Sequence, residues 1–267
     1  MIVHVVTDQP LDDDGEGTDL VRRLALAFPG VVVEICAVAG GDTLAAGFCV
    51  AQLACADGSD RRLVACWVGE DPAGGAPGPW PEGVGPRLCV GRGVAGTLIV
   101  GPNAGLCWSL ALPDLRGLCF LDVAHAGRDT WGGTVATAVA HAYCCHPHAV
   151  AGVVDRDAVP APPAPAVAHV DRHGTLKTTI IGLPARPGQT VDVRIGAIAA
   201  PALVSDGATG APRPSEGQLL LAPATSEWPA AADLGPPRYA ELRAVGGSAA
   251  DRFARPRTGT PIAVTYA

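Results

Sequence analysis

Polar residues that could bind a ligand or hold a proton recur just beyond apolar segments of this chain. Four of them follow successive apolar runs in the first half of the sequence: Asp8, Asp71, Asn103 and Asp129. Any one of them has a structural explanation, because Asp and Asn are favoured at turns and caps. Four at successive strand ends indicate more, since ligands of open α/β sheets bind beyond the carboxyl ends of the strands.

These residues must be positioned by the apolar segments that precede them. The pattern predicts strands at 2–6, 31–38, 63–68, 86–90, 97–100 and 119–123, and helices at 18–28, 43–56, 105–112 and 131–143. Thr18 is the expected N-cap of the first helix. Strands alternating with helices predict an α/β N-terminal domain with a mainly parallel sheet, and the β-branched run 31–38 is expected to be buried.

The composition changes at the Pro-rich segment 159–167, which favours an extended linker. Beyond it, short strand-like runs are broken by Gly and Pro at 167–170, 178–181, 190–195, 217–221 and 239–245. We therefore expect an α/β domain at 1–158, a linker at 159–167 and a small all-β, barrel-like domain at 168–267.

Charge and cysteine usage narrow the class of protein. The net charge of -7 and the lack of any Lys/Arg block argue against nucleic-acid binding, and no apolar run is long enough to span a bilayer. The 9 cysteines all precede residue 146, are odd in number and include no C-x-x-C spacing. This predicts free thiols in a reducing compartment, and hence a cytoplasmic protein.

Three other motifs have simpler interpretations. The run 91–96 fits G-x-G-x-x-G, but a strand pattern follows it, so we interpret it as a hairpin turn and not a dinucleotide site. The Cys/His-rich patch at 141–148 matches no common zinc spacing, and no metal is predicted. The acidic loop at 12–14 lacks EF-hand spacing, but Asp13 is a candidate ligand for an ammonium group.

Seven motifs, in this order along nearly the whole chain, resemble those of the S-adenosylmethionine hydroxide adenosyltransferases and the related fluorinase and chlorinase. The matching segments are Thr7-Asp8, 42–48 (D-T-L-A-A-G-F), 71–75 (D-P-A-G-G), 101–106 (G-P-N-A-G-L), 127–129 (G-R-D), 171–176 (D-R-H-G-T-L), and 239–242 (Y-A-E-L) with 246–250 (G-G-S-A-A). Each is weak alone, and their order makes the resemblance fairly specific.

The resemblance implies a homotrimer whose active sites are shared between subunits, and a small-molecule substrate with no cofactor. The implied reaction is attack of a nucleophile on the 5′ carbon of S-adenosylmethionine, with methionine leaving. Alignment and desolvation are the main tasks of such a site, because the sulfonium is already a good leaving group.

The resemblance also assigns roles by position. Asp8 resembles the carboxylate that holds the ribose diol, and Asp71 the aspartate that orients or deprotonates water. The remaining assignments are His125 and Arg128 as catalytic residues, and Asn103, Asp129, Asp171, Thr175 and Tyr239 as substrate-binding residues. Because the halogenases carry other residues at the position of Asp71, water is favoured over halide.

The chain departs from the family at several of these positions. Gly78 stands where the hydroxide enzymes have arginine, and Ala126 where they have histidine, with His125 one place earlier. Thr175 replaces an asparagine that contacts adenine and lacks its paired donor and acceptor.

The first expectation is therefore an enzyme that cleaves S-adenosylmethionine to adenosine and methionine. The departures leave two alternatives: a repurposed family member acting on another small molecule, or a non-catalytic nucleoside-binding protein.

Overall fold

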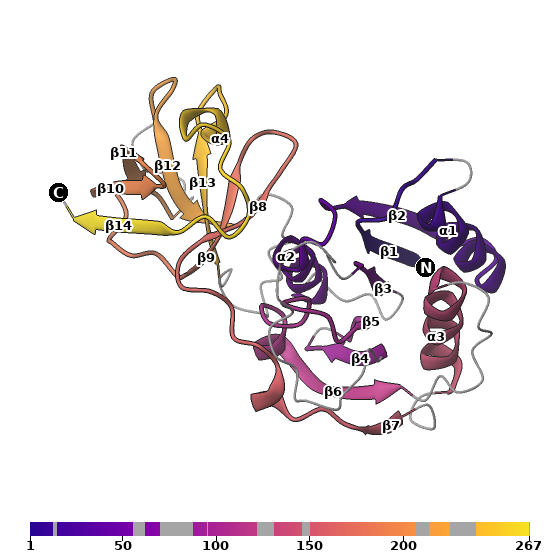
Figure 1. Ribbon diagram of the computed structural model, residues 1–267. Coiled ribbons are helices and arrows are strands. Elements are labelled where there is room, and N and C mark those ends of the chain that lie inside the picture. Colours follow the sequence, from indigo (N-terminus) through magenta and orange to yellow (C-terminus); the bar gives the residue numbers. More distant parts are fainter. Residues whose placement is uncertain are drawn as a thin grey trace. The chain divides into compact units, whose positions relative to one another are not determined.

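A computed structural model of the protein forms two compact units, Met1–Ala161 and Pro162–Ala267. It describes residues 1–12, 15–55, 62–69, 88–94, 96–121, 131–145, 150–206, 214–224 and 239–266, without the side chains of 16, 55, 131–134 and 145. The division between the units falls inside the Pro-rich segment. Each unit is built around its own sheet (Figure 1).

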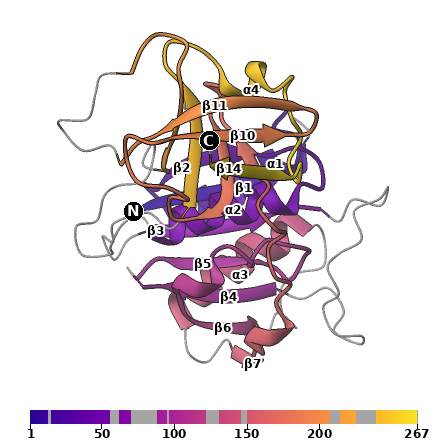
Figure 2. The same ribbon diagram turned by 90° about the vertical axis from the view of Figure 1, so that its left-hand side faces the viewer.

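The first unit contains a sheet with three longer helices packed on it. Its elements are β1 (Ile2–Thr7), α1 (Glu16–Ala27), β2 (Val32–Ala37), α2 (Thr43–Cys55), β3 (Arg62–Trp67), β4 (Leu88–Gly93), β5 (Leu98–Pro102), η1 (Leu112–Asp114), β6 (Leu115–Leu121), α3 (Trp131–Cys145), β7 (Val150–Val153) and η2 (Arg156–Ala158). Within the described ranges the strand order is β2-β1-β3-β5-β4-β6-β7. Figure 2 shows β5, β4, β6 and β7 following one another across one half of this sheet.

The predicted mainly parallel sheet is wrong, because this sheet is mixed. β1 pairs in parallel with β2 and β3, and β3 with β5. β4 runs antiparallel to both β5 and β6, and β6 antiparallel to β7. The hairpin of β4 and β5 is confirmed, and it accounts for the reversed direction of β4, because a tight hairpin must reverse the chain direction inside the sheet.

Helices cover both faces of this sheet (Figure 1). On one face, α1 and α3 pack against alternate residues of the central strands, and the buried cluster includes Val3, Val5, Leu20, Leu24 and Val139. On the other face, α2 packs against β1 and β3. α2 is apolar nearly all round and its described side chains are largely buried, as expected for a helix without a solvent face.

Several boundaries differ from those predicted. Gly15, not Thr18, is the N-cap of α1. The segment expected as a helix at 105–112 forms successive turns that lead into η1. β2 was expected to be buried, but it lies at the sheet edge, where Val32 is 56% and Ile35 42% exposed.

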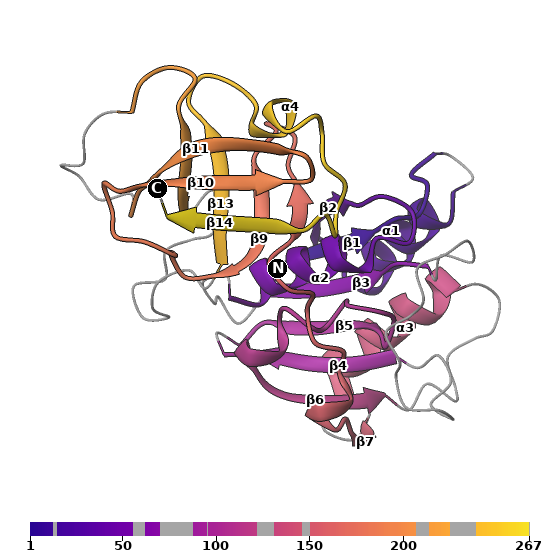
Figure 3. The same ribbon diagram turned by 60° about the vertical axis from the view of Figure 1, so that its left-hand side comes forward.

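The second unit also contains a mixed sheet. Its elements are β8 (Val167–Val170), β9 (Leu176–Ile181), β10 (Thr190–Ile195), β11 (Ile198–Val204), β12 (Leu219–Pro223), β13 (Tyr239–Ala244), α4 (Ala249–Arg252) and β14 (Ile262–Tyr266). Among the described residues the strand order is β14-β10-β11-β12-β13-β9-β8. In Figure 3, β11, β10 and β14 run side by side, while β13 and β9 cross them steeply.

The predicted small all-β domain is therefore also wrong. Over the residues described, the second sheet has as many strands as the first, includes the parallel pair β11 and β12, and carries the short helix α4. The sheet curls until Ala166, just before β8, forms a bridge with Pro261, just before β14. Its core lies on the inner face and includes Val191, Val193, Leu219, Leu242 and Phe253.

Candidate functional site

The carboxyl ends of β1, β2, β3 and β5 lie at one edge of the first sheet, because these strands are mutually parallel. Thr7, the last residue of β1, is aligned with Ala37 of β2 and Trp67 of β3. Asp8 and Asn103 are the residues that follow β1 and β5. The structure therefore brings these two predicted residues to the same edge, the edge at which open sheets bind ligands.

The Asp8 carboxylate is held at this edge by donors from three segments. Oδ2 accepts from the backbone N–H of Gly41 at 2.8 Å, and the N–H of Gly69 lies 3.1 Å from each oxygen. Oδ1 also accepts from Nε2 of Gln9 at 2.6 Å. Three donors on a half-buried carboxylate fix its direction.

Local backbone geometry explains the two glycines. Gly41 has φ of +71°, in the left-handed region that glycine adopts without strain. A Cβ on Gly69 would make a tight contact of 3.3 Å with Nε2 of Gln9 and an ordinary van der Waals contact of 3.6 Å with Oδ2 of Asp8. The positive φ of Gly41 and the tight space beside Gly69 are consistent with glycine at both points.

Asn103 lies in a buried turn that is braced on the protein interior. It is only 7% exposed, and the indole N–H of nearby Trp108 donates to the carbonyl of Pro102 at 2.8 Å. Gly105 has φ of +41°, and a Cβ there would collide with the side chain of Thr43. The turn after β5 is therefore fixed against the start of α2.

Buried thiols lie beneath this edge of the sheet. A hydrogen bond with Cys107, together with burial, raises the pKa of the Cys66 thiol well above its ordinary value, and the nearby charge of Asp8 adds to the effect. A thiol that stays protonated is a poor nucleophile and a poor metal ligand. The described cysteines are free, as predicted, and we assign Cys66 and Cys107 to packing.

The second unit places Asp171 and Thr175 in one tight turn at the start of β9. Oδ1 of Asp171 accepts from the backbone N–H of His173 at 2.8 Å and of Thr175 at 2.9 Å. Its Oδ2 lies 3.8 Å from Nζ of Lys177. Lys177 in turn forms a 2.7 Å ion pair with Glu241 on β13, and the side chains of both are at most 1% exposed.

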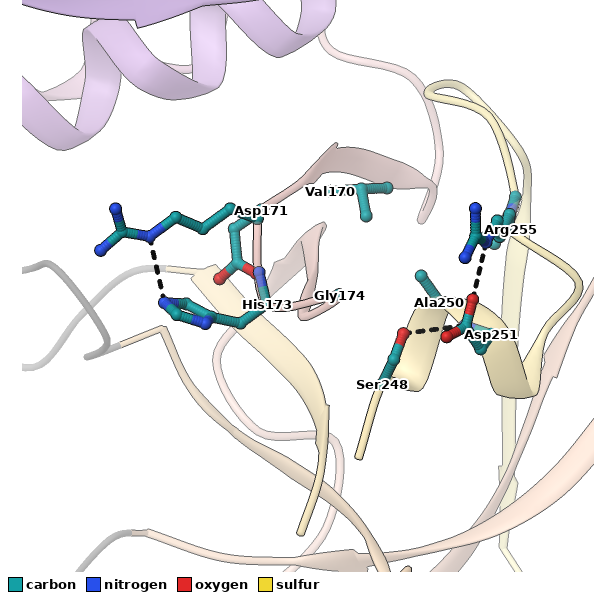
Figure 4. A pocket seen from close by; sticks show the side chains of 10 residues that line it. Val170, Asp171, His173, Gly174, Ser248, Ala250, Asp251 and Arg255 are labelled. Atoms are coloured by element: carbon teal, nitrogen blue, oxygen red, sulfur yellow. Dashed lines mark hydrogen bonds and ion pairs between the residues drawn. The ribbon is translucent and has the colours of Figure 1, made fainter. Parts of the chain in front are cut away.

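A pocket of about 450 Å³ opens beside this turn, lined by residues of the same unit. Figure 4 shows Asp171 and His173 on one side and Ser248, Asp251 and Arg255 on the other. Nε of Arg255 donates to Asp251 at 2.7 Å, and Ser248 caps α4 by accepting from the N–H of Asp251 at 3.0 Å. The lining includes both carboxylate and guanidinium groups. Such a lining suits a polar ligand that carries both charges.

The other predicted residues divide into two groups. Tyr239 is 2% exposed on β13. The rest lie outside the described residues, so their predicted roles remain predictions: Asp13, Asp71, His125, Arg128 and Asp129.

Sequence reasoning missed three groups around Asp8 and one buried pair. Gln9, Gly41 and Gly69 contact Asp8, and only the position of Gln9 next to it was a signal. Lys177 and Glu241 did carry a signal, because they are opposite charges in two strand sequences: Lys177 is the one charge of β9, and Glu241 shares β13 with Arg243. Within the described residues, no group of three or more His, Cys, Asp or Glu side chains has the geometry of a metal site.

Comparison with known proteins supports the fold alone. No family model matches the chain, and no curated protein matches its sequence. An uncharacterized conserved protein from Thermotoga maritima superposes with a TM-score of 0.72 at 16% identity, covering 98% of this chain and 99% of its own. A conserved hypothetical protein from Thermus thermophilus gives a TM-score of 0.63 at 23% identity, covering 98% of each chain.

None of the helices in the described part of the chain is long and apolar enough to cross a membrane.

Proposed function

We propose that this protein cleaves S-adenosylmethionine to adenosine and methionine, with water as the nucleophile. The observation that carries the proposal is the Asp8 carboxylate, which is fixed by backbone amides at the carboxyl edge of parallel strands. A carboxylate with a fixed direction at this edge supports binding of ribose hydroxyls. The ordered motif resemblance supplies the reaction.

In the proposed step, the water oxygen forms a bond to the 5′ carbon while the bond from that carbon to sulfur breaks. The electron pair of the broken bond stays on sulfur, which leaves as the neutral thioether of methionine. The water proton passes to a base, for which we propose Asp71. Asp8 binds the ribose, and Asp13, Asn103, Asp129, Asp171, Thr175 and Tyr239 are proposed to contact other parts of the substrate.

Asp8 in the first unit and Asp171 in the second are each held in a fixed direction, which supports binding of polar groups of a ligand at each. Each carboxylate accepts two backbone N–H groups, so neither must be oriented when the ligand arrives. Such preorganisation lowers the entropic cost of alignment, which is the main contribution a protein makes to this kind of displacement. A homotrimer remains part of the proposal, and light scattering in solution tests it.

The reaction is tested by incubating the protein with saturating S-adenosylmethionine in water enriched in oxygen-18. We expect equal amounts of methionine and adenosine by mass spectrometry, with one oxygen-18 atom in the 5′ hydroxyl. Asp71→Asn should lower turnover ~100-fold or more, the usual effect of losing a positioned base, and His125→Ala should be milder.

The matched control is Asp192→Asn, which removes an exposed carboxylate on β10 in the second unit and should leave turnover unchanged. Absence of both products from the parent protein refutes the proposed reaction. Adenosine without the isotope would show that water does not attack the 5′ carbon.

A further inference from the structure

The Asp8 carboxylate has little hydrogen-bonding capacity left. An ionised carboxylate offers about four lone-pair positions on its two oxygens. Oδ1 is contacted by Nε2 of Gln9 and N of Gly69, and Oδ2 by N of Gly41 and N of Gly69. A ligand with two hydroxyl donors can therefore bind Asp8 fully only if one of these donors leaves.

The three donors differ in how readily they can leave. The N–H groups of Gly41 and Gly69 belong to the backbone of two separate loops, so withdrawing either would require a loop to move. The Gln9 donor is the end of a half-buried, rotatable side chain. The backbone of Gln9 is held independently, because its N–H donates to Oγ1 of Thr7 at 3.0 Å. The amide can swing away while the chain stays in place.

We propose that Gln9 is a displaceable cap on Asp8, which a vicinal diol of a nucleoside ribose replaces at Oδ1. This inference rests on the proposed function, because that function supplies the ribose. Before a ligand binds, Nε2 of Gln9 donates to Oδ1 of Asp8 at 2.6 Å and helps to fix the orientation of the carboxylate. On binding, one ligand hydroxyl takes over this contact, so that Gln9 sets the affinity of the site for diols.

Isothermal titration calorimetry with adenosine tests the cap. Gln9→Ala removes the competing donor, and we expect adenosine to bind roughly three- to tenfold more tightly, the effect of a net hydrogen bond that no longer has to be exchanged. The gain should vanish with 2′,3′-dideoxyadenosine, which lacks the diol. Gln189→Ala, which removes an exposed glutamine from the second unit, should match the parent protein with both ligands.

Gln9→Leu provides a second version of the test, because it keeps most of the side-chain volume without the donor. It should show the same diol-dependent gain, and it decides the outcome if circular dichroism shows that Gln9→Ala is unfolded. An unchanged or weaker affinity for adenosine in the folded variant overturns the cap.

The two proposals fail in different ways. If Asp8→Ala abolishes adenosine binding while the Gln9 variants leave it unchanged, the cap is wrong and the proposed function is unaffected. If the diol-dependent gain is found but the parent protein releases no adenosine from S-adenosylmethionine, the reaction is wrong and the cap remains. If neither the parent nor the Gln9 variants bind adenosine, both are overturned.

Discussion

The buried pair of Lys177 and Glu241 provides the sharpest test of the second unit. The two residues are directly opposite on β9 and β13, and Nζ lies 2.7 Å from Oε2. Replacing Lys177 by Met keeps an unbranched apolar chain of similar length but leaves a carboxylate without its cation in a site that water does not reach. Breaking a buried pair in this way costs about 3–5 kcal/mol.

The double variant separates the cost of an orphaned charge from the value of the pair. Lys177→Met with Glu241→Leu removes both charges, and replacements of this kind range from neutral to stabilising by about 1–4 kcal/mol. Asp171 loses a neighbour at 3.8 Å but keeps its two backbone donors, so we expect only a small penalty there. The double variant should therefore be clearly more stable than Lys177→Met alone.

The assay is unfolding in urea, monitored by the hydrogen exchange of peptides from β9 and β13. These peptides report on the second unit separately from the first. The matched control is Arg255→Met, which breaks an ion pair of the same 2.7 Å length between exposed side chains. Solvent screens such a pair, so its loss should not shift the midpoint measurably. A cost below ~1 kcal/mol for Lys177→Met would refute the argument that burial, and not distance, determines the effect.

Three further outcomes are expected in the first unit. Burial lowers the pKa of His4 below its ordinary value, although Glu34 acts in the opposite direction. The contribution of His4 to stability is therefore full above pH 6.5 and is lost as the pH drops through the folded pKa. His4→Leu should flatten this pH dependence in unfolding experiments at pH 7.5 and 5.5. Gly101→Ala would place a Cβ 2.8 Å from Cβ of Cys66 and should destabilise by about 1–3 kcal/mol in urea, whereas Gly117→Ala, with open space around it, should not. Asp8→Asn places an amide where two backbone N–H groups point, so adenosine binding should weaken ~10-fold or more in calorimetry, and unchanged affinity would contradict the assigned role.

The strand that carries Asp8 could be predicted from sequence, and so could its place beside other strand ends, because a short apolar run closed by Thr-Asp leaves few alternatives. The direction of the later strands could not. β7 is short and contains Gly152, and β11 contains Pro201, so neither stands out by composition. β14 has a strand-like composition but was not predicted. Missing such strands hides the antiparallel pairings that make both sheets mixed.

The exposure of β2 could not be predicted from its local sequence pattern either. Its β-branched sequence has the composition of a central strand, yet its position at the sheet edge depends on which strands pair with β1 and β3. Pairing partners are determined by long-range packing, which no window of a few residues contains. The same limit explains why Gly41 and Gly69 were missed: each contacts Asp8 across 33 or more positions in the chain.

The contacts of Asp8 are of two kinds: two backbone amides that join it to loops, and one side-chain amide that does not. A structural latch between loops needs only the two glycine amides, which already join Asp8 to both loops. The Gln9 contact adds nothing to that latch, because it joins Asp8 to its own neighbour in the chain. A third donor that joins no loops has an evident use where the direction of the carboxylate must be kept until a ligand replaces that donor. The likeness to solved structures at 16% and 23% identity therefore establishes the scaffold, and the arrangement around Asp8 is where the proposed chemistry can be tested residue by residue.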